Sequence, residues 1–294
     1  MDYLITHRTT YEYAEPVSVS HHAARFEPRT EPGQECIGFR IGITPPPAVT
    51  KTHTDYFGNH VCVFSIQQLH QKMEVVAEST VSMAARTPPV PALSPRWNEV
   101  QARFRDPVSP ADVRPYEFCM DSPLVCASTE LAEYARKSFP EGTPLLLGVR
   151  DLTRRIHREF QYDPRATDVA TPLAEVWEQR RGVCQDFAHI GIACLRSLGL
   201  AARYVSGYLR TVAPPGKVKL IGADASHAWY SVYCPHTGWV DFDPTNDLLP
   251  ADEHVTIGVG RDFSDVSPLS GILTGGGEHE VSVAVDMIPM GRTR

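Results

Sequence analysis

The chain has 294 residues, of which 42% are hydrophobic and 21% charged, and 28 basic against 35 acidic residues give a net charge of −7. This length suffices for one large domain or two ordinary ones, and the composition is that of a soluble globular protein. The acidic balance, with no basic run longer than Arg180-Arg181, argues against nucleic acid or an anionic membrane as a partner.

The seven cysteines are an odd number, and no two of them have the C-x-x-C spacing of metal or redox sites. The first residues, MDYLITHRTTYEY, contain an early acid and no apolar core of a signal peptide. No run approaches the roughly 18 apolar residues that a membrane-spanning helix requires. These features predict a cytoplasmic protein with reduced thiols and no membrane association.

The first part of the chain has the pattern of short strands. Runs such as YLITHRTTYEY, ECIGFRIGI, NHVCVFSI and MEVVAESTVSM are rich in Val, Ile, Thr and aromatic residues, and turn residues separate them. This spacing predicts an N-terminal β-sandwich over residues 1–85. The proline-rich stretch that follows, RTPPVPALSP, predicts an extended linker over residues 86–105.

Helical periodicity begins after the linker. Helices are expected over SPLVCASTELAEYARKSF (capped by Ser122), PLLLGVRDLTRRIHREF and TPLAEVWEQRR, and then from Cys184 to the residue before Gly199. Three strands follow, AARYVSGYL, SHAWYSVY and GWVDFDPT, and an alternating strand, HEVSVAVDMI, lies near the end. We therefore predict an α+β domain over residues 106–294 that includes this C-terminal strand.

Cys184 differs from the other cysteines in its position. It lies at the expected start of a helix, where unpaired backbone N–H groups and the helix dipole favour a thiolate. Gly182 leaves the approach to the thiol free of a side chain. Cys194, flanked by apolar residues in the middle of the same helix, has the pattern of a buried core residue.

A thiolate nucleophile requires a base and a group that orients the base. His227 opens one alternating strand, and Asp241 and Asp243 lie on one face of the next strand, about 7 Å apart. A three-residue loop that pairs Tyr233 with Thr237 would place His227 opposite Asp243. The hairpin geometry thus favours Asp243 as the orienting carboxylate, whereas a loop of even length would not.

The segments GVCQDFA, SHAWYSVY and GWVDFDPTND resemble the Cys, His and Asp motifs of bacterial transglutaminase-like proteins, which are often described as cysteine proteases. YEYAEPVSVSHHAARFEPR and DYFGNHVCVF are similar to the N-terminal domain of that family, and GRDFSDVSPLSGILTGGGEHEVSVAV to its closing segment. The resemblance implies a β-sandwich followed by a transglutaminase/papain-like core. It also implies Cys184 as nucleophile, His227 as base and Asp243 as the residue that orients the base.

Two further residues are candidates for supporting roles. Gln185 could line an oxyanion hole with the backbone N–H of Cys184, although a solvated side chain is the commoner state of a Gln in a first helical turn. Tyr162, in FQYD, could reach the site or pack in the core. Asp186 is explained by the preference of acids for a helix N-terminus. No cofactor is expected, and the histidines of the β-rich region lack the spacing of a metal site.

The expected function is acyl transfer on amide bonds of a peptide or protein substrate, with hydrolysis preferred because water is always present. Transamidation to an amine acceptor and a non-catalytic binding protein on the same fold stay open as alternatives. The loop from Arg210 to Asp224 precedes His227 and could cover the substrate groove. The sequence does not determine the substrate or the oligomeric state.

Overall fold

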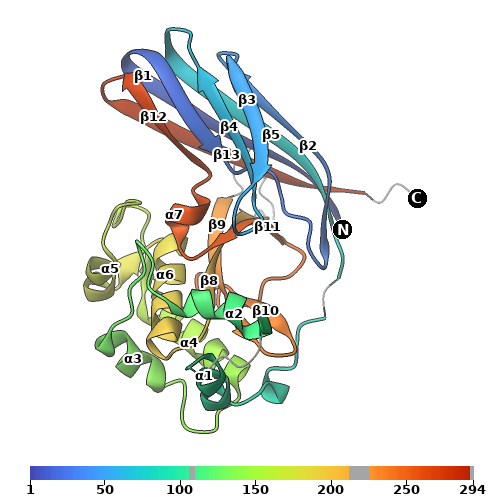
Figure 1. Cartoon of the computed structure of the whole chain (residues 1–294), viewed down its shortest axis with the longest axis vertical. Helices are drawn as coiled ribbons and strands as arrows, with labels where there is room; N and C mark the ends of the chain where they lie inside the picture. The colour runs from blue at the N-terminus through green and yellow to red at the C-terminus, as the bar shows by residue number, and fades with distance from the viewer. Residues whose placement is uncertain (86, 106–109, 212–224, 292–294) are drawn as a thin grey trace, which may run out of the picture.

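The structure, a computed structural model, describes residues 1–85, 87–105, 110–211 and 225–291. A β-rich part, which contains both ends of the described chain, lies above a second part in which helices pack on a smaller sheet (Figure 1). The α+β class predicted from the sequence is confirmed. Among the described residues, no helix is both long enough and apolar enough to span a membrane.

The β-rich part is one seven-stranded sheet in which the first strand has a central place. Its five N-terminal strands are β1 (Asp2–Ala24), β2 (Gln34–Thr44), β3 (Val49–Thr54), β4 (His60–Ile66) and β5 (His70–Met83). The first half of β1 pairs with β5, and its second half pairs with β4. Side chains of β1, β4 and β5 share one apolar core. The expected sandwich is therefore a single sheet folded over itself.

The C-terminal strands belong to this sheet and not to the helical part, which corrects the expected place of the C-terminal strand. They are β12 (Leu269–Gly275) and β13 (His279–Met290), and both pair antiparallel with β1. Val285 and Met287 of β13 are buried in the same cluster as Tyr3 and Ile5 of β1. Alternating polarity predicts a strand with one buried face, but it does not identify the strand beside it.

The second part has seven helices in the described residues and a four-stranded antiparallel sheet. The helices are α1 (Trp97–Arg105), α2 (Pro110–Tyr116), α3 (Thr129–Arg136), α4 (Leu145–Glu159), α5 (Leu173–Gln179), α6 (Cys184–Ser197) and α7 (Phe263–Val266), with short 3₁₀ turns at Pro91–Leu93 and Glu117–Cys119. The sheet has the order β10 (Gly238–Phe242), β9 (Ala225–Cys234), β8 (Ala202–Leu209), β11 (His254–Gly260). A small parallel pair joins β6 (Gln161–Tyr162) to β7 (Arg181–Gly182).

Two local expectations are corrected in the helical part. Residues 97–105 of the expected linker form α1, whose Val100 and Phe104 are buried in the helical core. The helix expected to be capped by Ser122 is α3, which begins seven residues after Ser122 and is capped by Ser128, whose hydroxyl accepts the backbone N–H of Leu131 at 3.1 Å. A proline next to the expected cap suits a first helical turn as well as a tight turn, so its presence alone could not identify the cap.

Helix α6 is the central element of this part. Every residue from Asp186 to Arg196 is buried, because α6 packs against β8 and β9 on one side and against α3, α4 and α5 on the others. Apart from Asp186, His189 and Arg196, these buried residues are apolar or glycine, which is typical of a helix that is enclosed on all sides. The ring of Tyr230 on β9 lies so close to Gly191 that a Cβ there would collide with it. This packing fixes the position of the first turn of α6 relative to the sheet.

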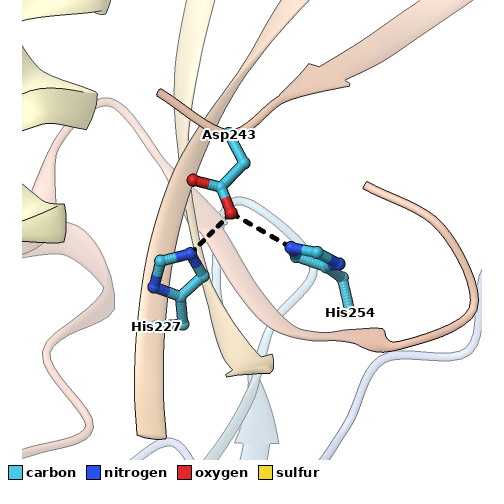
Figure 2. Close-up of side chains that lie close together, drawn as sticks. All are labelled: His227, Asp243 and His254. Carbon is cyan, nitrogen blue, oxygen red and sulfur yellow. Dashed lines mark hydrogen bonds and ion pairs between the residues drawn. The ribbon is translucent and has the colours of Figure 1, made fainter. Parts of the chain in front are cut away.

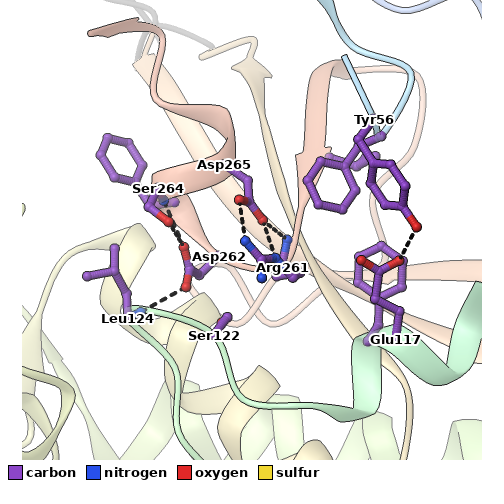
Figure 3. Close-up of polar contacts among 12 residues, drawn as sticks. Tyr56, Glu117, Ser122, Leu124, Arg261, Asp262, Ser264 and Asp265 are labelled. Atoms are coloured by element: carbon purple, nitrogen blue, oxygen red, sulfur yellow. Dashed lines mark hydrogen bonds and ion pairs between the residues drawn. The ribbon is translucent and has the colours of Figure 1, made fainter. Parts of the chain in front are cut away.

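Polar contacts join the segment after β11 to the neighbouring loops (Figure 3). The Asp262 carboxylate accepts the backbone N–H of Leu124 at 2.8 Å, and Arg261 forms an ion pair with Asp265 at 2.9 Å. From the β-rich part, the hydroxyl of Tyr56 donates to Glu117 at 3.1 Å. The two parts therefore contact one another directly on this side of the molecule.

Candidate active site

The first turn of α6 holds Cys184 in a defined position. Val183 is the extended residue before the helix, and its backbone N–H donates to the Asp186 carboxylate at 2.8 Å. The same carboxylate accepts the hydroxyl of Thr167 at 2.6 Å. Burial raises the pKa of Asp186, although these hydrogen bonds act in the opposite direction. Asp186 is thus the acidic half of a capping arrangement that holds the helix start.

Gly182 is required by this cap. A Cβ at residue 182 would collide with the carboxylate of Asp186. The glycine therefore makes room for a buried carboxylate, in addition to any effect on access to Cys184. Its position in β7, paired with Tyr162, fixes the chain just before the helix.

His227 and Asp243 lie together beside the first turn of α6. His227 is on β9 and Asp243 directly follows β10, and Nε2 of the imidazole lies 2.8 Å from Oδ2 of the carboxylate. Both side chains are buried, with exposed fractions of 7% and 0%. Cys184 also lies close enough to His227 to contribute to a raised pKa of the imidazole. Since Nε2 is engaged with Asp243, Nδ1 is the ring nitrogen left for the thiol.

The charges of this group reinforce one another. Burial opposes protonation of His227, but its interactions with Asp243 and Cys184 outweigh burial and raise its pKa to about 10. Burial would also raise the pKa of Asp243, but its hydrogen bonds with His227, His254 and Asn246 hold that pKa well below the usual range. The carboxylate is therefore ionised and the imidazole favours the protonated form at neutral pH.

The hairpin register differs from the expected one. Gly238 pairs with Cys234, so the three-residue loop is 235–237 and each pair is shifted from the predicted alignment. Backbone φ values of 67° at His236 and 87° at Gly238 shape this turn. The shift preserves the face of each residue, but it places Asp241 opposite Ser231. Asp243 lies beyond the end of β10 and reaches His227 diagonally.

Sequence reasoning missed two residues that contact Asp243. The amide Nδ2 of Asn246 donates to Oδ2 at 2.7 Å. Nε2 of His254 lies 3.1 Å from the same oxygen (Figure 2). Asn246 lies inside the motif GWVDFDPTND, so the motif contained a signal for it. His254 lies in another strand, β11, outside the quoted motifs, and its role depends on the sheet order.

The two expected supporting residues have different surroundings. Tyr162 is 54% exposed and its ring lies edge-on to Phe187, and burial together with the negative charge of a Cys184 thiolate raises its pKa. Its phenol is therefore within electrostatic reach of the thiol. Gln185 is half-buried and lines a cavity of about 520 Å³ between α3, α5 and the start of α6.

Two family descriptions match the chain. Residues 3–82 match the bacterial transglutaminase-like N-terminal region, and residues 132–244, which include Cys184, His227 and Asp243, match the transglutaminase-like superfamily. An uncharacterized protein of Mycobacterium tuberculosis is 39% identical over 98% of this chain and 92% of its own length. The chain belongs to the transglutaminase-like superfamily.

Other relatives of this transglutaminase-like protein differ in how much they share with it. An uncharacterized protein of Mycobacterium leprae is 31% identical over 96% of the chain and 97% of its own length. A crystal structure of a "Putative Cysteine Protease" from Cytophaga hutchinsonii covers all of this chain, with a TM-score of 0.75, 22% identity and 92% of that chain covered. At that identity the likeness supports the two-part fold. A protein-glutamine gamma-glutamyltransferase of Pseudomonas aeruginosa is 30% identical over 41% of this chain and 18% of its own length.

One group of side chains in the described residues of this transglutaminase-like protein has the composition of a metal site. The donor atoms of His227, Asp243 and His254 all lie within 4.8 Å of one another. Both imidazoles direct Nε2 at one carboxylate oxygen, as hydrogen-bond donors do. Residues 212–224, most of the loop expected to cover the groove, lie outside the described residues.

Proposed function

We propose that this protein is a cysteine-dependent enzyme that transfers the acyl group of an amide, with Cys184, His227 and Asp243 as its triad. The observation that supports this most directly is the buried imidazole of His227, which bonds Asp243 at 2.8 Å and whose pKa is raised in part by Cys184 at the start of α6. Family membership supports the same chemistry, because the segment that matches the transglutaminase-like superfamily, residues 132–244, contains all three triad residues.

The reaction would proceed in two halves. The Cys184 thiolate attacks the amide carbonyl carbon, and the backbone N–H of Cys184 stabilises the developing oxyanion. The C–N bond breaks, His227 gives its proton to the leaving amine, and a thioester remains. A second nucleophile then loses a proton to His227 and attacks the thioester, which releases the product and regenerates the Cys184 thiolate and the protonated imidazole. Asp243 holds the imidazole in the tautomer that this proton transfer requires.

Hydrolysis is the proposed second half-reaction, since water needs no dedicated binding site. Peptide or protein amides are the proposed substrates, and the enzyme needs no cofactor for these steps. Transamidation to a primary amine is the second candidate, and the relative named a protein-glutamine gamma-glutamyltransferase favours it. The two outcomes share the thioester and differ only in the molecule that attacks it.

The test uses a panel of glutamine-containing peptides with and without excess primary amine. We expect release of ammonia and a glutamyl product by the wild type, and at least a thousandfold less by Cys184→Ala, because removal of the nucleophile abolishes the covalent route. Cys36→Ala is a matched control, since Cys36 is also a half-buried free cysteine and lies in the N-terminal sheet.

The products separate the candidates. Acid and ammonia as main products support hydrolysis, whereas an amine-coupled peptide at modest amine concentration makes the protein a transamidase. Undiminished activity in Cys184→Ala would exclude the thiol mechanism.

A further inference from the structure

The carboxylate of Asp243 is shared by two histidines. His227 and His254 lie on different sides of Oδ2, at 2.8 and 3.1 Å (Figure 2). An ionised carboxylate only accepts hydrogen bonds, so each Nε2 carries a proton toward it. The known triad chemistry uses only the first of these bonds. The second bond has no part in proton transfer and requires another explanation.

His254 has little else to bond. It is 4% exposed, and its other ring nitrogen, Nδ1, has no hydrogen-bond partner in the part of the chain that the structure describes. A buried polar atom without a partner costs free energy. The bond to Asp243 is thus the polar contact that accounts for a histidine at this position. Its ring packs edge-on against the ring of Trp229, with 5.3 Å between the ring centroids.

The bond from His254 restricts how the carboxylate can turn. Backbone N–H groups of Thr245 and Asn246 hold Oδ1 at 2.9 and 3.2 Å. Oδ2 is the oxygen that faces His227, and its direction depends on the side-chain donors His254 and Asn246. Without His254, one fixed donor fewer opposes rotation of the carboxylate away from the imidazole.

His254 is in turn held by the N-terminal part of the molecule. It opens β11, whose one edge pairs with β8. On β11, Gln34 bonds Thr256 twice, with Oε1 accepting the backbone N–H at 2.8 Å and Nε2 donating to the carbonyl at 2.7 Å. Asn59 bonds Val259 in the same two ways, at 2.8 Å each. Gln34 and Asn59 are both buried.

The side-chain amides of Gln34 and Asn59 bond the free backbone edge of β11, as a neighbouring strand would. A backbone segment bonded on both edges cannot slide or fray, so β11 keeps the register that directs His254 at Asp243. Thr256 is only two residues from His254, and therefore Gln34 is the closer support. Gln34, a residue of the N-terminal domain, is thus connected to Asp243 through Thr256 and His254.

We propose that His254 is a positioning residue that fixes Asp243, and that the N-terminal domain holds His254 in place through the bonds of Gln34 to β11. This inference rests on the acyl-transfer function proposed above. It gives the N-terminal domain a role in the chemistry of the second part, through a chain of contacts Gln34, Thr256, His254 and Asp243.

The first experiment compares His254→Ala with His254→Gln. The alanine variant should lower kcat about tenfold with KM within about twofold, because His254 is only 4% exposed and would act on the reaction through Asp243. The amide of glutamine can donate from near the position of Nε2, so His254→Gln should recover most of kcat. His22→Ala is the control, since it removes a buried histidine of the N-terminal sheet that does not contact Asp243.

The second experiment is a double-mutant cycle with Gln34→Leu. Alone, this variant should lower kcat in the same direction, and combined with His254→Ala it should add little, because both act on one carboxylate. Additive losses would overturn the link between Gln34 and His254. Unchanged kcat in His254→Ala would overturn the positioning role.

A readout independent of turnover separates this inference from the proposed function. The low-field proton NMR signal of the His227–Asp243 hydrogen bond should shift in His254→Ala and Gln34→Leu and stay in place in His22→Ala. If no amide is turned over by the wild type but the signal shifts in this way, the acyl-transfer proposal fails and the positioning role stands. Stoichiometric zinc in the purified protein, with activity lost on chelation, would make His254 a metal ligand and overturn the proposal.

Discussion

Asp241 and Asp243 are separated by one residue and have opposite surroundings. Asp243 is fully buried and bonds His227, whereas Asp241 lies opposite Ser231, whose hydroxyl donates to it. Burial lowers the pKa of the Arg203 guanidinium to about 10, and the charge of Asp241 opposes that effect. Asp241 therefore balances a buried cation, and Asp243 serves the imidazole.

This difference predicts opposite effects of the same substitution. Asp243→Asn should lower kcat by roughly 10²–10³, because the imidazole loses the partner that sets its tautomer, and a thiolate is less dependent on its base than a serine. Asp241→Asn should stay within about tenfold of the wild type. Steady-state kinetics, with circular dichroism to verify folding, measures both. A larger loss in Asp241→Asn would reverse the assignment.

At the scale of an element, the first turn of α6 depends on the fit between Gly182 and Asp186. The carboxylate caps the helix from a buried position and occupies the space that a side chain at residue 182 would need. Gly182, the start of α6 and the capping carboxylate of Asp186 therefore form one local arrangement. Any shift of this arrangement moves Cys184 relative to His227.

Gly182→Ala should therefore affect both stability and activity. We expect a loss of about 1–3 kcal/mol in the free energy of unfolding, the range of steric conflict in a packed site, together with a reduced kcat. Urea denaturation measures the first effect. Gly38→Ala is the control, because no heavy atom lies within 4 Å of its added Cβ, and it should cost less than about 1 kcal/mol. Equal losses in the two variants would contradict the role of Asp186.

At the scale of the whole molecule, the last strands of the chain lie beside its first strand. β12 and β13 pair with β1 after the chain has formed the complete helical part. His7 on β1 lies at the junction of the two parts, where the hydroxyl of Tyr208 on β8 contacts its Nδ1 at 2.9 Å. Burial lowers the pKa of His7 to about 4, so this junction is built around a neutral imidazole.

The buried histidines predict how stability changes with acidity. His7, His22 and His189 all have pKa values lowered to about 4, mainly by burial. Between pH 6.5 and about 4 the unfolded chain binds protons that the folded chain excludes, so their contribution is complete above pH 6.5 and is lost as the pH falls through that range. Each can contribute on the order of 3 kcal/mol.

Thermal unfolding should show this loss directly. We expect Tm to fall steadily from pH 7 to pH 4.5, with a smaller slope in His7→Gln, which removes one titrating group from the junction. The slope of Tm against pH is the quantity to compare, because the substitution can also lower Tm by the same amount at every pH. An identical slope in wild type and His7→Gln would show that His7 is not buried in its neutral form.

The sequence by itself determined the α+β class and the family, and it predicted Cys184, His227 and Asp243 as the triad. These rest on local patterns: alternation marks strands, glycine and acidic residues mark the start of α6, and motif residues lie within a few positions of one another. The hairpin that carries His227 and Asp243 was also recognisable, since its two strands are consecutive. Its register was not, because the positive φ values at His236 and Gly238 set the turn.

Only the tertiary structure decided the partner of the C-terminal strands and the contact of His254 with Asp243. β13 is paired with β1 although about 250 residues of chain lie between the two strands, and alternation is the same whichever strand lies beside it. His254 meets Asp243 because β11 lies beside β8 in the sheet and is held there by Gln34 and Asn59. Contacts of this kind arise from the packing of distant segments, which short-range patterns in the sequence do not encode.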